Sequence, residues 1–169
     1  MSEHHLSTPL SLEDVRMLEA GDVVFLSGIV YSARDKAHAL IRKAGCPVSL
    51  QGAALYHCGP LILDGRVLSA GPTTSGRLAR YTDEMLGQGV RAIIGKGGLP
   101  PEPFRDRAVY LAYPGGCGAA AARHLEVLTV NLSELGMAES LWAFRAKDFG
   151  PLIVAIDSQG RDLYQEARE

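Results

Sequence analysis

Gly71-Pro72-Thr73-Thr74-Ser75-Gly76-Arg77, followed by Gly95-Lys96-Gly97-Gly98, is the part of the sequence that decides the fold. Residues 78–86 between the two motifs predict a helix, and residues 90–94 predict a short apolar strand. The first motif places hydroxyls and a guanidinium where a helix begins, and free N–H groups and the helix dipole favour an anion there. The second places a lysine among glycines after a strand, where open α/β sheets bind ligands.

Together the two motifs predict a site for a small dianion. Taken alone, the first also fits a simple turn with a helix cap, and the second fits an ordinary glycine-rich loop. The rest of the sequence has to decide between these interpretations.

The composition is that of one globular domain. Of the 169 residues, 47% are hydrophobic and 21% are charged, as in soluble proteins that bury one core. The net charge of −2 comes without a basic stripe, so we expect no nucleic-acid partner. No apolar run is long enough to cross a bilayer, and residues 1–5 lack the features of a signal peptide. We therefore expect no membrane partner and a cytoplasmic location.

The cysteine pattern argues against a metal cluster held by this chain alone. Cys46, Cys58 and Cys117 are too few and too scattered for a disulfide framework. Three thiolates would suit a cluster with one open iron, but no Cys-x-x-Cys pair anchors it locally. We expect buried free thiols at Cys46 and Cys58, and no metal ligands in this chain.

Strands and helices alternate along the chain, which predicts an α/β domain with mixed sheets. Residues 11–14 resemble a capped helix start, and further helices are expected at 35–44, 78–86 and 119–125. Strands are expected at 22–28, 53–58, 61–63, 66–70, 90–94, 107–113, 126–130, 142–146, 152–157 and 163–164. Asp64-Gly65 signals a two-residue hairpin, and turns are expected at 149–151 and 158–160.

Two further places carry candidate chemistry. Arg34 lies at the start of a helix that follows a strand. Its positive charge is unfavourable there because the helix N-terminus is itself partly positive, whereas the negative charge of the neighbouring Asp35 is favourable. That unfavourable position indicates a ligand carboxylate, although a contact with Asp35 or with solvent is the simpler alternative. His38, one turn further, is expected to be a packed or surface histidine rather than a base. Residues 113–118 form a third glycine-rich turn, which is either another anion site or a place of tight packing.

These motifs together resemble the iron–sulfur hydro-lyases. The chain is similar to the β subunit of L(+)-tartrate dehydratase and of two-subunit class I fumarate hydratase, and to the C-terminal domain of single-chain class I fumarases. The resemblance spans about residues 6–164 of a single domain, 1–169, and the chain ends sooner after Tyr164 than some of these proteins. The residues that carry the resemblance are 26–28, 34–38, 56–60, 71–77, 95–98, 114–117 and 148–157.

The resemblance implies a swivelling β/β/α domain that supplies half of an active site. The other half, with the cysteines that hold a 4Fe–4S cluster, is expected on a separate α subunit, so the protein would be a hetero-oligomer. The reaction implied is reversible loss of water from a 2-hydroxy diacid. Residues 27–34 are more similar to fumarase, which predicts the hydration of fumarate to L-malate. Tartrate dehydration and a non-catalytic anion-binding swivelling domain are the alternatives.

The implied chemistry assigns roles to six residues. Proton removal next to a carboxylate builds up a second negative charge, so fixed positive charge on the dicarboxylate substrate is needed. By the resemblance Thr73 is the expected base, with Thr74 as the alternative, and Lys96 is the cation that enables it. The residues expected to bind substrate are Arg34, Arg77, Thr74 and Gly97.

Overall fold

A single long strand, β9 (Leu141–Ile156), pairs with three other strands and holds the fold together. The computed structural model describes residues 1–168. Across these residues a seven-stranded sheet has the order β1 (Glu3–Ser7), β2 (Val23–Ala33), β3 (Ala54–His57), β6 (Ala92–Gly95), β7 (Val109–Ala112), β9 and β8 (Leu125–Asn131). A separate hairpin consists of β4 (Leu61–Leu63) and β5 (Arg66–Ser69).

Five of the strands close into a ring. Neighbours in the series β2, β3, β6 and β7 are parallel, and β9 runs antiparallel to both β7 and β2. Ile153 of β9 is paired with Val23 on one side and with Ala112 on the other. The ring therefore has no free edge at this level, and its interior is filled by apolar side chains such as Tyr56 and Phe149.

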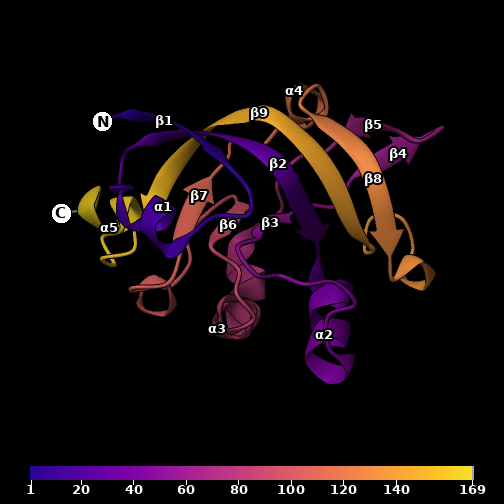
Figure 1. The fold of residues 1–169 in the computed structure, drawn as a ribbon, viewed down its shortest axis with the longest axis horizontal. Coiled ribbons are helices and arrows are strands. Elements are labelled where there is room, and N and C mark those ends of the chain that lie inside the picture. Colours follow the sequence, from indigo (N-terminus) through magenta and orange to yellow (C-terminus); the bar gives the residue numbers. More distant parts are fainter. Residues whose placement is uncertain (169) are drawn as a thin grey trace.

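The layers are sheet, sheet and helix, which confirms the expected β/β/α architecture. In Figure 1 the curved strands β1, β2, β9 and β8 arch over β3, β6 and β7, and the helices α2 (Asp35–Ala44) and α3 (Ala79–Gly87) lie beneath. The strands of the middle layer are buried on both faces because they separate two cores. Along β3, for example, Tyr56 belongs to the core inside the ring, and Leu55 belongs to the core between the middle sheet layer and the helices.

Shorter elements complete the chain. Helix α1 (Leu12–Arg16) begins with a capping box, in which Ser11 and Asp14 bond each other's backbone N–H, as the sequence predicted. The hairpin turn expected at Asp64-Gly65 is present, with positive φ at both residues. The helices α4 (Gly118–Ala122) and α5 (Leu163–Glu166) and the 3₁₀ turns 75–78, 102–104 and 133–135 are all short. No helix in the described residues is long and apolar enough to cross a membrane.

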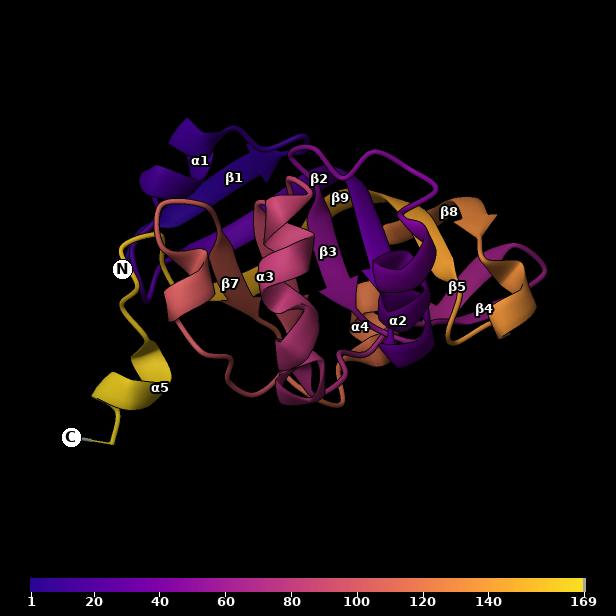
Figure 2. The same cartoon turned by 90° about the horizontal axis from the view of Figure 1, so that it is seen from below.

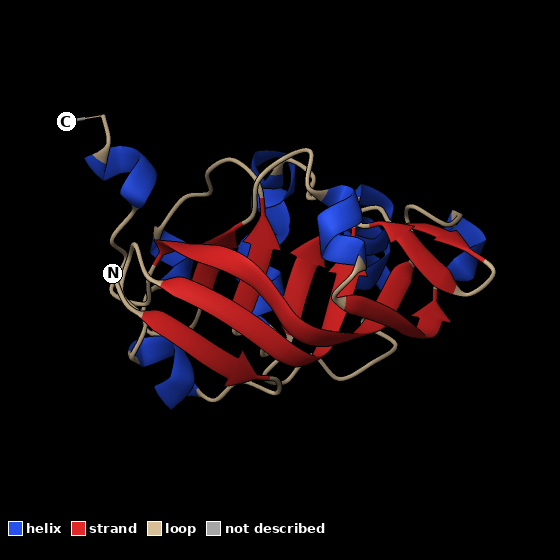
Figure 3. Cartoon of the chain, turned by 90° about the horizontal axis from the view of Figure 1, so that it is seen from above, coloured by secondary structure: helices blue, strands red, loops and turns tan. Residues whose placement is uncertain are grey.

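Three predicted elements are wrong, two because strand pairing overrides the local signal and one because a local helix cap was missed. The turn expected at 149–151 lies inside β9, where Phe149 pairs with Leu26 and the strand continues through Gly150-Pro151. Figure 3 shows the long strands of the sheet, to which β9 belongs, as continuous arrows. The strand expected at 163–164 is the helix α5, whose first turn is capped by the Asp162 carboxylate. The helix expected at 119–125 ends at Ala122, because residue 125 already belongs to β8.

Candidate active site

Four parallel strands end at one edge of the sheet, and the predicted motifs follow those ends. Arg34 comes after β2, His57 ends β3, Lys96 comes after β6 and Tyr113 comes after β7. In Figure 2 this edge faces the lower side, where the chain enters α3. The carboxyl ends of parallel strands are where α/β sheets bind ligands. The two anion motifs of the sequence therefore meet at one place.

The threonine loop, residues 71–75, bridges the ends of β3 and β6. Thr73 N–H donates to the His57 carbonyl at 2.7 Å, and Lys96 N–H donates to the Thr73 carbonyl at 3.2 Å. Ser75 N–H donates in turn to the Lys96 carbonyl at 2.9 Å. The loop thus extends the sheet by one short rung, and it ties Thr73 to Lys96 through the backbone.

The two threonine side chains have different surroundings. Thr74 is the ladder partner of Lys96, so the two side chains leave the same face of this short parallel bridge. Thr73 is half-buried, and its hydroxyl donates to the His57 carbonyl at 3.2 Å. Neither hydroxyl caps the helix that follows, since Thr74, at the cap position, makes no side-chain cap bond. The hydroxyls at the loop are therefore not explained by helix capping.

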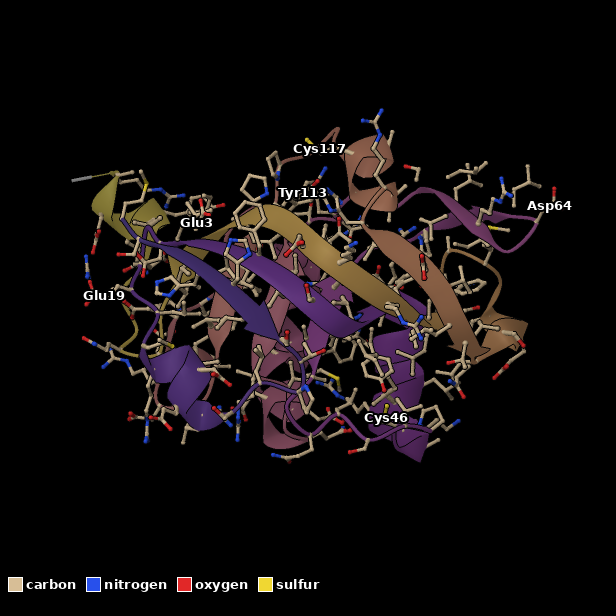
Figure 4. The ribbon with its side chains drawn as sticks, turned by 45° about the horizontal axis from the view of Figure 1, so that its top comes forward. Glu3, Glu19, Cys46, Asp64, Tyr113 and Cys117 are labelled. Carbon is tan, nitrogen blue, oxygen red and sulfur yellow. The ribbon has the colours of Figure 1, made fainter. Side chains whose placement is uncertain are left out.

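Lys96 lines a pocket with the third glycine-rich turn. The pocket has a volume of about 330 Å³ and is lined by Lys96, Gly97, Ala112, Tyr113, Pro114, Gly115, Ile153 and Tyr164. A Cβ at Gly115 would lie 3.6 Å from Lys96 Nζ, so the ammonium comes close to this turn. Figure 4 shows Tyr113 and Cys117 on the same side of the molecule, close to α4. The sequence predicts a strand at residues 163–164 and gives no signal that Tyr164 lines this pocket, which it does from the helix α5.

Of the two interpretations of the third turn, the structure shows the tight packing, and an anion site there stays a prediction. Its first glycine, Gly115, adjoins the Lys96 ammonium, whereas Gly118 packs where a side chain does not fit. A Cβ at Gly118 would overlap Ser69 Oγ, and the Gly118 carbonyl accepts the Ala70 N–H at 3.0 Å. Gly118 therefore holds the start of the threonine loop in place.

Arg34 has a protein partner, and it is neither of those considered from the sequence. Its Nε lies 3.5 Å from Glu139 Oε1, and Glu139 Oε2 accepts the Lys36 N–H at 2.9 Å. The Arg34 side chain packs over Gly59, where a Cβ would lie 2.6 Å from Arg34 Cδ. Burial raises the pKa of the nearby Cys58 thiol to about 12, against the opposing effect of the Arg34 charge. Arg34 therefore lies at the carboxyl edge of the sheet with its positive charge partly balanced by Glu139.

Arg77 is the less constrained guanidinium. It lies in the 3₁₀ turn 75–78 that precedes α3, and its side chain is exposed. Within residues 1–168 it makes no ion pair. Its five donors are thus free for a ligand carboxylate, which arginine binds in a bidentate way.

Behind the loops lies a polar cluster that the sequence did not single out as one. His57, Ser75 and Tyr110 are each at most 1% exposed and are joined by hydrogen bonds. His38 is packed against His57 with ring centroids 5.2 Å apart, and its Nδ1 donates to the Arg34 carbonyl at 2.8 Å. Burial lowers the pKa of His38. The expectation that His38 is packed is confirmed.

The three cysteines do not assemble a metal centre. Cys58 is buried, Cys46 and Cys117 are half-buried, and all three are free thiols. In the part of the chain that the structure describes, no three His, Cys, Asp or Glu side chains gather as a metal site. The residues of this chain therefore do not fit a 4Fe–4S cluster by themselves.

Comparison with known proteins agrees with the resemblance. The family model described as Fumarase C-terminus matches residues 2–167. The chain is 38% identical to L(+)-tartrate dehydratase subunit beta of Escherichia coli strain K12, over 97% of this chain and 88% of that protein. It is 40% identical to a Methanocaldococcus jannaschii protein that provisionally carries the same subunit name, over 95% of this chain and 90% of the relative.

A third relative is a longer protein. A Geobacillus stearothermophilus protein provisionally named fumarate hydratase class I is 37% identical over 95% of this chain, which covers 33% of that relative. The match to the family model covers nearly the whole chain, and its range includes every loop of the carboxyl edge. The chain belongs to the Fumarase C-terminus family.

Proposed function

We propose that this chain is the β subunit of a two-subunit hydro-lyase that reversibly hydrates a four-carbon unsaturated diacid. The observation that carries the proposal is that backbone hydrogen bonds join the Thr73 and Lys96 segments at the carboxyl ends of parallel strands. Arg34 directly follows β2 at the same edge, and Arg77 lies in the turn that follows the threonine loop. Family membership and relatives named as subunits of tartrate dehydratase support it. The partner would be an α subunit, which makes the enzyme a hetero-oligomer.

The residues divide the chemistry between charge and proton transfer. Arg77 grips one carboxylate of the diacid through paired hydrogen bonds, and Arg34 and Lys96 supply further positive charge. The Gly97 backbone and the Thr74 hydroxyl lie beside Lys96 and complete the substrate contacts. Such fixed charge lowers the cost of the second negative charge that forms as the C3 proton leaves.

Thr73 is the proposed proton acceptor, with Lys96 as the cation that lowers the cost of its charged form. The backbone bond between Lys96 N–H and the Thr73 carbonyl holds the two residues together. Thr74 is the alternative because it shares a face with the Lys96 side chain. A hydroxyl is a weak base, so a neighbouring cation or a basic group from the α subunit is required.

The cluster belongs on the partner in this proposal. A 4Fe–4S cluster would supply the Lewis acid that helps hydroxide leave. The purified β chain is therefore expected to be folded, colourless and inactive. An iron–sulfur absorbance band that appears on anaerobic reconstitution of this chain, and disappears with Cys117→Ser, would contradict the division. A cytoplasmic location stays a prediction.

Two diacids are the leading substrates. Fumarate and L-malate are favoured by residues 27–34, which resemble fumarase, and by the relative provisionally named fumarate hydratase class I. L(+)-tartrate, dehydrated to oxaloacetate, is favoured by the names of the Escherichia coli and Methanocaldococcus relatives. The four-carbon dicarboxylate is common to both.

Anaerobic co-expression with the α subunit tests the proposal directly. The complex is assayed with L-malate, L(+)-tartrate and mesaconate, and turnover of one diacid is expected only when both subunits are present. A complex carrying Arg77→Ala and Lys96→Met serves as the matched inactive control. A chain that binds dicarboxylates but activates no α subunit would instead support a non-catalytic binding domain.

A further inference from the structure

The buried groups behind the two loops form one continuous chain of hydrogen bonds. His57 Nδ1 lies 2.9 Å from Ser75 Oγ, and Ser75 Oγ lies 3.1 Å from the Tyr110 hydroxyl. The Tyr110 hydroxyl lies 2.8 Å from the Gly97 carbonyl oxygen. The three side chains come from the end of β3, from the threonine loop and from β7. This series of hydrogen bonds thus runs beneath the site from the threonine loop to the Lys96 loop.

The donors and acceptors available allow only one direction of donation along this hydrogen-bond chain. The Gly97 carbonyl can only accept, so the one Tyr110 proton goes to it. The contact between Ser75 and Tyr110 then needs the Ser75 proton, which leaves Ser75 Oγ as acceptor toward His57. His57 must therefore donate from Nδ1. The direction fixes a proton on Nδ1 of His57, and burial of the ring disfavours a second proton, so the imidazole is neutral.

The hydrogen-bond chain holds the threonine loop and the Lys96 loop through neighbouring backbone groups. The carbonyls of Lys96 and Gly97 are bonded by Ser75 N–H and by the Tyr110 hydroxyl, respectively. At the other end, the His57 carbonyl accepts both the N–H and the hydroxyl of Thr73. The fit is tight, since a Cβ at Gly95 would overlap Ser75 Oγ. A shift of any member would move the segment that carries Lys96 or Thr73.

We propose that His57, Ser75 and Tyr110 are positioning residues that hold the Lys96 and threonine loops in one geometry, with His57 locked as the Nδ1–H tautomer. The role in a diacid site rests on the function proposed above, whereas the tautomer rests on geometry alone. None of the three side chains reaches the surface, so they act through Lys96 and Thr73. Burial gives the network its strength, because a buried group without a partner is costly.

The first test uses the full chain without its partner. Nitrogen-15 NMR of the histidine rings, assigned through the backbone, reports which nitrogen of His57 carries the proton. The expected result is a neutral Nδ1–H ring in the wild type and in Tyr56→Phe. Tyr56→Phe is the matched control, since it removes another buried tyrosine bond to a carbonyl, that of Ala70 at 2.6 Å. A His57 ring protonated on Nε2 in the wild type would overturn the proposal.

The second test separates positioning from mere stability in the αβ enzyme. Tyr110→Phe frees the Gly97 carbonyl and is expected to raise KM for the diacid about 5- to 10-fold and to lower kcat as well, because the segments that carry Lys96 and Thr73 shift. Ser75→Ala should do the same, and the double variant should be little worse than either single one because they break one chain. Tyr56→Phe should leave KM within about twofold.

The outcomes keep this inference apart from the function itself. Unchanged KM in Tyr110→Phe, or an equal rise in Tyr56→Phe, would overturn the positioning role. If no diacid is turned over, the proposed function fails, and the ring tautomer still decides whether the hydrogen-bond chain exists. Variants that fail to fold leave the wild-type NMR result as the deciding measurement.

Discussion

Among single residues, Arg77 is the one whose charge and shape are expected to matter separately. It is exposed and free of ion pairs within residues 1–168, so a carboxylate can meet both of its parallel donors. We predict that Arg77→Lys lowers kcat/KM of the αβ enzyme by about 30- to 1,000-fold, or roughly 2–4 kcal/mol, because bidentate contact is lost while charge is kept. The control is Arg80→Lys one turn further, where an exposed arginine lies over the Tyr81 ring at 4.8 Å. Near-normal kcat/KM in Arg77→Lys would reduce Arg77 to a residue of the helix start.

Thr73 and Lys96 are expected to work as one unit. Thr73→Ala and Lys96→Met should each cut kcat sharply, and the double variant should be little worse than either, as for groups that act together. Substrate-analogue binding should survive Thr73→Ala better, because only Lys96 carries charge. Steady-state kinetics of the three variants and of Thr74→Ala measure this. If the losses in kcat add in free energy, the two residues are not coupled. If Thr73→Ala is active and Thr74→Ala is inactive, Thr74 is the proton acceptor instead of Thr73.

The sequence singled out the residues at the surface of the site but not those beneath it. Arg77 and Lys96 stand out because cations beside glycines at the ends of elements suit anions. Ser75 looked like part of a turn, and His57 and Tyr110 looked like strand residues. Their hydrogen bonds span separations of 18 and 35 residues, and no local spacing encodes such contacts. Glu139, the partner of Arg34, was hidden for the same reason.

Among the elements, the strand β6 and the helix α3 each end in a glycine, and only the glycine of β6 lies where a side chain does not fit. Gly95 ends β6, and a Cβ there would overlap the buried Ser75 hydroxyl. Gly87 ends α3 with open space around it and no positive φ. We predict that Gly95→Ala destabilises the chain by about 1–3 kcal/mol through overpacking, whereas Gly87→Ala stabilises it by about 0.5–1 kcal/mol. Urea unfolding measures both, and equal effects would show that the overlap at Gly95 relaxes freely.

Local signals predicted the elements whose conformation is decided locally. The turn at Asp64-Gly65 and the cap at Ser11 depend on residues next to each other, and both are present. The course of β9 depends on β2 and β7, so Gly150-Pro151 looked like a turn although it lies in a strand. The resemblance implied the β/β/α layers, whereas ring closure depends on long-range pairing that residue periodicity does not encode.

For the whole molecule, two buried histidines should make the fold sensitive to acid. Burial lowers the pKa of His38 and, more strongly, of His57, where the neighbouring His38 adds to the effect. Both stay neutral in the fold, while the unfolded chain binds protons below about pH 6.5. Stability should therefore fall as the pH drops below 6.5, by about 1.4 kcal/mol per pH unit for each histidine.

Urea unfolding of the chain at pH 7.5, 6.5 and 5.5 measures this dependence. His38→Gln, which keeps a donor for the Arg34 carbonyl, should reduce the slope, and the part that remains comes from His57. His5→Gln should steepen it, because hydrogen bonds to Glu3 and Asp148 raise the pKa of His5, so its charged form favours the fold at low pH. Stability that stays level from pH 7.5 to 5.5 would contradict the assignment.

The place of β9 in the chain has a consequence for how the protein is made. Ribosomes release the strands in order, so β2 and β7 emerge long before the segment 141–156 that pairs with both. Until then each presents an unpaired edge, the kind of surface on which nascent chains join one another. Products of translation stalled before residue 141 should therefore aggregate, and the proposed α subunit would meet a finished partner only after the last long strand has been released.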